Sequence, residues 1–275
     1  MPQVDQEFVI VSAKRTAIGR FGGSLKNIHS GDLAAVVLKD AIETTGILND
    51  QINEIILGEV RQSSESSNVA RVAGLKAGIP AAAYTVNRLC ASSMQAVVSG
   101  VQHLAFHPDS IVIAGGTENM SRAPIYLRNS RFGEGNPYLV DSNLENGQQP
   151  TEMYGKDLGM GMTAENVAEK YGISREDQDL FALESQKRAK YAWENGKFDS
   201  QIIPVEVKVK RETMMFSKDE HLRETSIKQL EGLKPVFKKN GTVTAGNACG
   251  RNDGASALVL MTKEKAKNMG LKPLV

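Results

Sequence analysis

Short apolar runs alternate with helical patterns through the first 116 residues of the chain. The runs predict strands at FVIVSA (8–13), EIILGEV (54–60), AYTVNR (83–88) and SIVIAGG (110–116). Between them, apolar residues recur at helical spacing near residues 31–45, 68–77 and 92–106. Strands that alternate with helices in this way are typical of an α/β domain.

The pattern changes after about residue 120, where longer polar loops surround two well-capped helical segments. One segment opens at Thr163 and ends at Gly172, and the next opens at Ser174 and ends at Gly196. This change of texture favours a domain that is inserted into the first one.

The strand pattern returns near the end of the chain in NDGASALVLMT (252–262). A short helix that ends at Gly270 follows, and the apolar segment LKPLV reads as the start of a further strand. We therefore predict an α/β domain over residues 1–120 and an inserted loop domain over 121–244. Residues 245–275 are predicted to return to the first domain and to begin a second one.

Composition narrows the class of protein. A chain of 275 residues with 41% hydrophobic positions is long enough to bury a large core. Its 33 basic and 32 acidic residues leave a net charge of +1, which gives no overall field for nucleic acid or an anionic membrane. The sequence shows neither a secretory signal pattern nor an apolar stretch of membrane-spanning length. We therefore expect a cytoplasmic protein without nucleic-acid or membrane partners.

The two cysteines, Cys90 and Cys249, are too few to predict a disulfide framework. Cys90 lies where a predicted strand runs into the helix near 92–106, and the small residues Ala91, Ser92 and Ser93 follow it. Unpaired backbone N–H groups and the dipole at a helix N-terminus favour a thiolate, which is the nucleophilic form. The placement alone leaves two interpretations open, a nucleophile or a small buried side chain.

Five segments resemble the thiolase family and follow one another in the family's order. They are VIVSAKRTAIGRFGGSL, NRLCASSMQAV, AGGTENMSRAP, MGMTAENVAEKYGISREDQD and GTVTAGNACGRNDGASALVLM. The resemblance covers essentially the whole chain. It implies a thiolase-like N-terminal α/β domain in which a mixed five-stranded sheet carries helices on both faces. It also implies an inserted loop domain, with the second thiolase domain absent.

Thiolases cleave a 3-ketoacyl-CoA with free CoA, or condense two acyl-CoA molecules, through an acyl-cysteine intermediate. The resemblance implies that Cys90 is the nucleophile that accepts the acyl group. It also implies CoA contacts at Met160 in the pantetheine channel, at Arg223 near the nucleotide end, and at Ala245 and Cys249. A guanidinium suits stacking on adenine or pairing with phosphate. Coenzyme A is then substrate and product, and no other cofactor and no metal is expected.

Two of these residues have a simpler interpretation when the residues are read alone. Arg223 is equally typical of a solvated surface charge. Cys249 is equally typical of a small residue packed beside the turns at Gly246 and Gly250. A hydroxyl often stands at the position of Cys249 in thiolases, and a thiol is a weaker hydrogen-bond donor.

The resemblance also implies catalytic groups that this sequence does not contain. In thiolases the second domain supplies an Asn, a His in a Gly-His-Pro segment and a second Cys. None of His29, His103, His107 and His221 stands in such a segment. His103 and His107 have a spacing that permits metal binding, but no further ligand cluster accompanies them. We therefore expect almost no turnover from the isolated chain.

Two classes of function follow. The first is an acyl-CoA C-acyltransferase of fatty acid metabolism, incomplete on its own, whose missing domain comes from a separate chain or from a longer gene product. The second is a non-catalytic acyl-CoA-binding or assembly module derived from a thiolase. The intact segment around Cys90 favours the first, and the long MGMTAEN insert disfavours a condensing enzyme of fatty-acid synthesis. Acyl-CoA ligands and a homo-oligomer are expected in either case.

Overall fold

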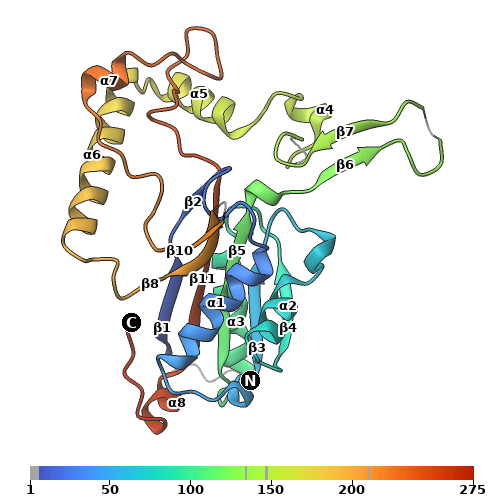
Figure 1. The fold of residues 1–275 in the computed structure, drawn as a ribbon, viewed down its shortest axis with the longest axis vertical. Helices are drawn as coiled ribbons and strands as arrows, with labels where there is room; N and C mark the ends of the chain where they lie inside the picture. Colours follow the sequence, from blue (N-terminus) through green and yellow to red (C-terminus); the bar gives the residue numbers. More distant parts are fainter. Residues whose placement is uncertain (1–5, 134, 146–147, 210) are drawn as a thin grey trace. The chain divides into compact units, whose positions relative to one another are not determined.

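The structure is a computed structural model that describes residues 6–133, 135–145, 148–209 and 211–275. The chain forms two compact units, and each is described by itself (Figure 1). Unit 1 consists of Met1–Tyr126, Ser200–Glu220 and Asn252–Val275, within the described residues. Unit 2 consists of Leu127–Asp199 and His221–Arg251, again within the described residues.

Unit 1 is built on a mixed sheet. Its principal strands lie in the order β4 (Ala82–Val86), β3 (Glu54–Gly58), β5 (Val112–Asn119), β11 (Asn252–Thr262) and β1 (Phe8–Thr16). Two-residue strands extend it, with β2 (Gly19–Arg20) beside β11 and β8 (Ile202–Ile203) beside β1. Strand β3 runs parallel to β4 and β5, whereas β11 runs antiparallel to β5 and β1. This confirms the mixed sheet of five principal strands that the sequence predicts.

Helices cover both faces of this sheet (Figure 1). Helices α1 (Ser30–Glu43) and α2 (Val69–Lys76) pack on one face, and α3 (Ser92–Phe106) packs on the other. The residues of β3 form an uninterrupted apolar run because the strand is buried on both faces. Ile55 and Leu57 enter the core beneath α1 and α2, while Ile56 enters the core beneath α3. A parallel strand that is buried on both faces has no polar side to alternate with.

The segment 200–220 belongs to unit 1, although the predicted inserted domain included it. It contains the hairpin of β9 (Val205–Val209) and β10 (Glu212–Phe216). Val205, Val207 and Phe216 are buried in the core of unit 1, whereas Glu206 and Lys208 are exposed. The alternation of VEVKV places every second side chain inward, and that apolar face draws the segment to the sheet. Unit 2 begins at Leu127 and ends at Arg251, so both borders lie a few residues later in the sequence than the predicted borders at 121 and 244.

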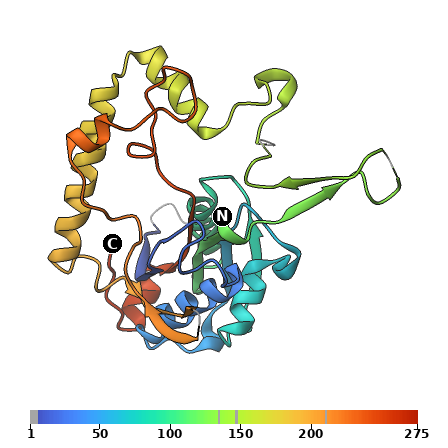
Figure 2. The same ribbon diagram turned by 45° about the horizontal axis from the view of Figure 1, so that its top comes forward.

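Unit 2 contains the helices α4 (Thr151–Tyr154), α5 (Met160–Tyr171), α6 (Arg175–Glu194) and α7 (Ile227–Glu231), together with strand β7 (Tyr138–Asp141). Strand β7 pairs with β6 (Ile125–Arg128), which begins in unit 1. Figure 2 shows α5 and α6 joined by a short turn. Gly172 ends α5 in a left-handed conformation, and Ser174 caps α6 in a capping box with Asp177. Both caps were predicted, while α5 begins at Met160 rather than at Thr163.

The remaining elements are short. They are the 3-10 helices η1 (Asn49–Gln51), η2 (Ser64–Ser66) and η3 (Met120–Arg122), and the helix α8 (Lys263–Asn268). Residues 271–275 form no named strand, but Leu274 N–H donates to Ile10 O at 2.8 Å and Ile10 N–H donates to Val275 O at 3.1 Å. None of the helices in the described ranges combines the length and the apolar character that crossing a membrane requires.

Candidate functional site

Cys90 lies in the turn between β4 and α3. Helix α3 begins at Ser92, as predicted, with Ala91 as its N-cap residue, so Cys90 stands just before the helix. The thiol is free and the residue is exposed. The interpretation of Cys90 as a small buried side chain is therefore wrong, and a group in solution can reach the sulfur.

Two glycines bring the first turn of α3 directly onto the sheet. A Cβ atom at Gly58, the last residue of β3, would lie 2.6 Å from the backbone carbonyl carbon of Ser92. A Cβ atom at Gly116 in β5 would clash with Ser93 Oγ. At Gly58 only glycine permits such an approach of the helix backbone, and at Gly116 an added side chain would displace that of Ser93. The helix start, and with it Cys90, is thus fixed at the carboxyl edge of the parallel strands, where open α/β sheets bind their ligands.

Three carboxyl groups lie at the same edge of the sheet, those of Glu59 and Asp253, which are buried, and that of Glu118, which is half-buried. Burial raises the pKa of Glu59 to about 7, although a hydrogen bond with Ser30 opposes the shift, and the nearby Glu118 raises it further. Glu59 is only 2% exposed, and its Oε2 atom has no hydrogen-bond partner among the residues that the structure describes. Burial also raises the pKa of Glu118 and of Asp253. This edge of unit 1 therefore holds a carboxyl group, that of Glu59, which exchanges its proton near neutral pH.

In unit 2, the structure brings Arg223 and Ala245 together. Arg223 Nη2 donates to Ala245 O at 3.4 Å, and Arg223 N–H donates to Gln186 Oε1 at 3.0 Å. A pocket with a volume of about 190 Å³ opens beside Arg223. Its lining residues are Gln186, Arg223, Glu224, Thr225, Gln229, Leu230, Leu233 and Gly246. The pocket offers a cation, the carboxylate of Glu224 and several neutral polar groups to a ligand.

Met160 and Cys249 are not among the residues that line this pocket. Met160 is the first residue of α5 and is 61% exposed, and a Cβ atom at the adjacent Gly161 would clash with the ring of Phe237. Cys249 is a free, exposed thiol. A Cβ atom at Gly250 would lie 2.6 Å from the His221 ring, so that ring covers the backbone next to Cys249. Sequence reasoning gave His221 no role at this position.

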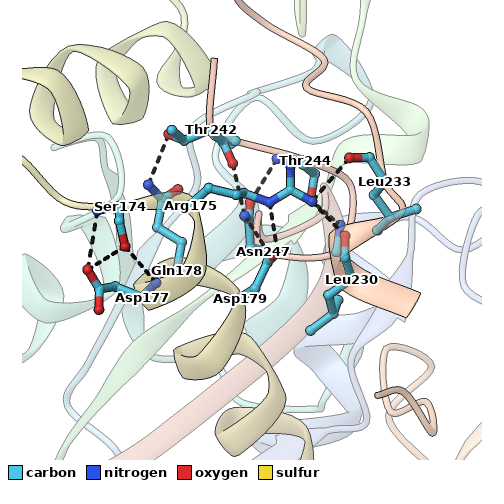
Figure 3. Close-up of polar contacts among 12 residues, drawn as sticks. Ser174, Arg175, Asp177, Gln178, Asp179, Leu230, Leu233, Thr242, Thr244 and Asn247 are labelled. Atoms are coloured by element: carbon cyan, nitrogen blue, oxygen red, sulfur yellow. Dashed lines mark hydrogen bonds and ion pairs between the residues drawn. The ribbon is translucent and has the colours of Figure 1, made fainter. Parts of the chain in front are cut away.

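A buried polar network holds the segments that flank the pocket, and Figure 3 shows it. Asp179 is fully buried and accepts from Arg175 Nε at 2.7 Å and from Asn247 Nδ2 at 2.9 Å. Arg175 Nη2 donates to Leu230 O at 2.5 Å and to Leu233 O at 3.1 Å. Helix α6 therefore fixes both the segment 230–233 and the segment 242–247, and these segments supply Leu230, Leu233 and Gly246 to the pocket.

Glu165 on α5 anchors the same second segment. Its carboxylate accepts from Val243 N–H at 2.8 Å and from Thr242 N–H at 2.9 Å. Burial acts to raise the pKa of Glu165, but the hydrogen bonds from Thr242 and Val243 outweigh it and lower the pKa. Sequence reasoning missed Glu165 and Asp179. The only local signal for them was the spacing of Arg175 and Asp179, four residues apart on one helix face.

Metal chemistry finds no support in the described part of the chain. No three His, Cys, Asp or Glu side chains within it converge on a point where an ion could sit. The rings of His103 and His107 lie 4.8 Å apart, and His103 also faces Glu54 and Ser110.

The chain matches the family model described as "Thiolase, N-terminal domain" over residues 8–264. It is 44% identical over 272 residues to a "Probable acetyl-CoA acyltransferase" of Staphylococcus aureus (strain MRSA252), a match that covers 97% of this chain and 68% of the relative. Among solved structures, the acetyl-CoA acetyltransferase of Bacillus anthracis gives a TM-score of 0.91 at 42% identity, over 98% of this chain and 68% of that one. Human mitochondrial 3-ketoacyl-CoA thiolase gives a TM-score of 0.91 at 40% identity, over 98% and 69%.

The mixed sheet with helices on both faces, and these matches along nearly the whole chain, define a protein of the thiolase fold. The chain belongs to the thiolase family. It spans about 68% of the length of the bacterial relatives described above.

Proposed function

We propose that the chain is an acyl-CoA C-acyltransferase in which the Cys90 thiolate accepts an acyl group. The single observation that carries the proposal is the exposed thiol at the start of α3, on the carboxyl edge of the sheet. In thiolytic cleavage the thiolate attacks the 3-keto carbon of a 3-ketoacyl-CoA. The bond between that carbon and the α-carbon breaks, the acyl group stays on sulfur, and the departing carbanion takes a proton. Free CoA then removes the acyl group as a new thioester.

We propose that the pocket beside Arg223 receives the nucleotide end of CoA. Its volume of about 190 Å³ is below the usual range for a whole drug-sized ligand, so it suits one end of a long molecule. The guanidinium of Arg223 can stack on adenine or pair with a phosphate, and Thr225 and Gln229 add neutral polar contacts. Ala245, Met160 and Cys249 are proposed to line the remaining length of the CoA chain.

We also propose that a second thiolase domain, from a separate chain or a longer product, completes the catalytic site. Helix α3 supports this, because Ala96 and Leu104 are buried against the sheet while Met94 and Val98 are 66% and 42% exposed. An apolar helix surface that faces solvent is typical of an interaction site. A homo-oligomer is proposed on the same grounds, from the exposed Ile125, Leu127 and Leu139 of the hairpin β6–β7.

A role in fatty acid metabolism follows from the acyl-CoA substrate proposed here. A cytosolic location is also proposed, because Cys90 and Cys249 are free thiols and a reducing compartment keeps them so. The competing candidate is a non-catalytic acyl-CoA-binding or assembly module. It would use the pocket beside Arg223 and leave Cys90 unmodified.

The test is to incubate the chain with acetyl-CoA and to locate any acetyl group by peptide mass mapping. We expect acetylation at Cys90, its loss in Cys90→Ala, and its persistence in Cys249→Ala. Thiolysis of acetoacetyl-CoA is then measured with and without a separately expressed thiolase C-terminal domain. Turnover that appears only on mixing supports the proposal. Acyl-CoA binding with Cys90 unmodified contradicts it and supports the non-catalytic module.

A further inference from the structure

The residue before Cys90 has a backbone conformation that is costly for its type. Leu89 has a φ angle of 51°, in the left-handed region, although it carries a branched side chain. This conformation is unfavourable for a residue other than glycine. Such strain persists only where the surroundings hold it, and it often marks a functional turn.

The N–H group of Leu89 is held by Asn87. Asn87 Oδ1 accepts from Leu89 N–H at 3.0 Å, and Asn87 Nδ2 donates to Val60 O at 3.3 Å. Val60 is itself fixed, because its N–H donates to the Glu118 carboxylate at 2.9 Å. A chain of hydrogen bonds therefore links the turn to the ends of β3 and β5.

The carbonyl group of Leu89 is held by Ser92. Ser92 Oγ donates to Leu89 O at 2.6 Å and accepts from Arg88 N–H at 2.9 Å. The Ser92 side chain is nearly buried, with 4% exposure, beside the backbone of Gly58. Two side chains, one on each side of Cys90 in the sequence, thus bind the two polar backbone groups of Leu89, and the Ser92 N–H also donates to the Leu89 carbonyl at 3.0 Å.

We propose that Asn87 and Ser92 are positioning residues that lock Leu89 in its left-handed conformation and thereby present the Cys90 thiol to its reaction partner. Neither residue is assigned a contact with substrate. Both act through the Leu89 backbone, whose direction sets where the next residue points. The inference rests on the proposed function, because Cys90 is the reacting group there.

The first experiment measures thiol reactivity without any acyl-CoA. The full chain is treated with iodoacetamide, and peptide mass mapping follows the alkylation rates of Cys90 and Cys249 separately. Cys249 is a free, exposed thiol in unit 2 and serves as an internal reference. We expect Asn87→Ala and Ser92→Ala to change the ratio of the two rates on the order of fivefold, since each loses two hydrogen bonds that hold the turn. A ratio that stays within twofold of the parent in both folded variants overturns the proposal.

A matched control and a rescue separate positioning from general damage. Asn53 Oδ1 accepts from Ile111 N–H at 2.8 Å at the opposite end of β3, so Asn53→Ala removes a similar side chain far from the turn. We expect this variant to keep the parent ratio, and a ratio changed as in Asn87→Ala contradicts the proposal. Leu89→Gly in the Asn87→Ala chain should recover part of the effect, because glycine adopts positive φ freely. If Ser92→Ala does not fold, the alkylation ratios of Asn87→Ala and of its Leu89→Gly rescue are sufficient to test the proposal.

The acetylation assay keeps this inference distinct from the proposed function. A changed alkylation ratio in Asn87→Ala, together with a parent chain that acetyl-CoA never acetylates, supports the positioning role and contradicts the proposed function. Acetylation of the parent chain at Cys90 with an unchanged ratio in Asn87→Ala supports the proposed function and overturns the positioning role. Asn87→Asp keeps the acceptor for Leu89 N–H and loses the donor to Val60, so we expect it to lie between the parent and Asn87→Ala.

Discussion

The two units are stabilised by different means. Both clusters of buried apolar residues lie wholly in unit 1. Among the described residues of unit 2, the buried apolar side chains are those of Ala168, Leu230 and Val243, and the buried polar ones are those of Ser142, Glu165, Asp179 and Thr244. Unit 1 is therefore fixed by apolar packing, whereas unit 2 depends on buried hydrogen bonds and on the Arg175–Asp179 ion pair. Each unit should respond to a different kind of substitution.

The largest effect is expected at Asp179. Replacing it in Asp179→Ala leaves the Arg175 guanidinium and the Asn247 amide without their buried partner, which typically costs about 3–5 kcal/mol. Unit 2 should then open to protease while unit 1 stays resistant, as limited proteolysis followed by mass mapping would show. Asp177→Ala, on the same helix but exposed, serves as the matched control and should cost about 1 kcal/mol. Equal protection of unit 2 in both variants would contradict this account.

The second effect concerns pH and unit 1. The pKa of Glu59 is raised from its usual 4.5 to about 7, chiefly by burial, so the folded state binds a proton that the unfolded state releases between these values. The stability contributed by this group is therefore present below pH 4.5 and is lost as the pH rises to 7. Glu59→Gln should remove that dependence and stabilise the chain at pH 8 by about 1–3 kcal/mol.

Urea unfolding at pH 5 and pH 8 checks this, with Glu43→Gln on the exposed side of α1 as the control. The difference between Glu59→Gln and the parent should grow from pH 5 to pH 8, while the difference for Glu43→Gln should stay flat. A Glu59→Gln chain that is less stable than the parent at pH 8 would show that the buried carboxylate is well satisfied.

A smaller effect is expected in the pocket of unit 2. Arg223→Ala should weaken CoA binding about tenfold, or about 1.4 kcal/mol, because it removes the guanidinium while Gln186, Thr225 and Gln229 remain. Isothermal titration with CoA measures this at one fixed salt concentration. Arg188→Ala, an exposed arginine of α6 that pairs with Glu184 outside the pocket, should leave the affinity unchanged. Equal losses of CoA affinity in the two variants would show that the overall charge of the protein, and not the pocket, determines the effect.

The smallest effect compares the same interaction in both units. Ser174 caps α6 in unit 2 and Thr262 caps α8 in unit 1, and each side chain accepts a backbone N–H of its helix. Replacing either by Ala should cost about 1 kcal/mol. Thr262 Oγ1 also donates to Pro108 O at 3.1 Å, so thermal unfolding should show the larger loss for Thr262→Ala. A larger loss for Ser174→Ala would mean that unit 2 depends on its caps more than its buried network suggests.

Most of what the sequence predicts about unit 1 comes from the periodic spacing of its apolar residues. Strand β11 and helix α3 have the predicted bounds of 252–262 and 92–106, because apolar residues of both elements are buried in the core of unit 1. The same reasoning missed the left-handed Leu89, since Asn87 and Ser92 are common polar residues and nothing local marks their bonds. In unit 2, Asp179 and its partner Asn247 lie 68 residues apart, a separation that no local pattern encodes.

The same limit applies to the residues that are predicted to contact CoA. Arg223 and Ala245 come together because α6 fixes the segments around them through a few specific hydrogen bonds. Whether Met160 and Cys249 share a surface with Arg223 stays a prediction. Segment 200–220 shows the reverse case, because the alternation of VEVKV is present in the sequence, yet the prediction assigned the segment to the inserted domain.

Gly58 and Gly116, the two glycines beneath α3, limit how this protein can evolve. An added side chain would meet the backbone of Ser92 and Ser93 at Gly58, and the Ser93 side chain at Gly116, and the two glycines have no side chain of their own that mutation could shorten or lengthen gradually. A lineage can exchange valine for isoleucine elsewhere in the core, and the neighbours adjust by small shifts. The distance between Cys90 and the sheet is therefore not changed by small core substitutions of this kind. That distance changes only in one large step, when a mutation gives one of the two glycines a side chain.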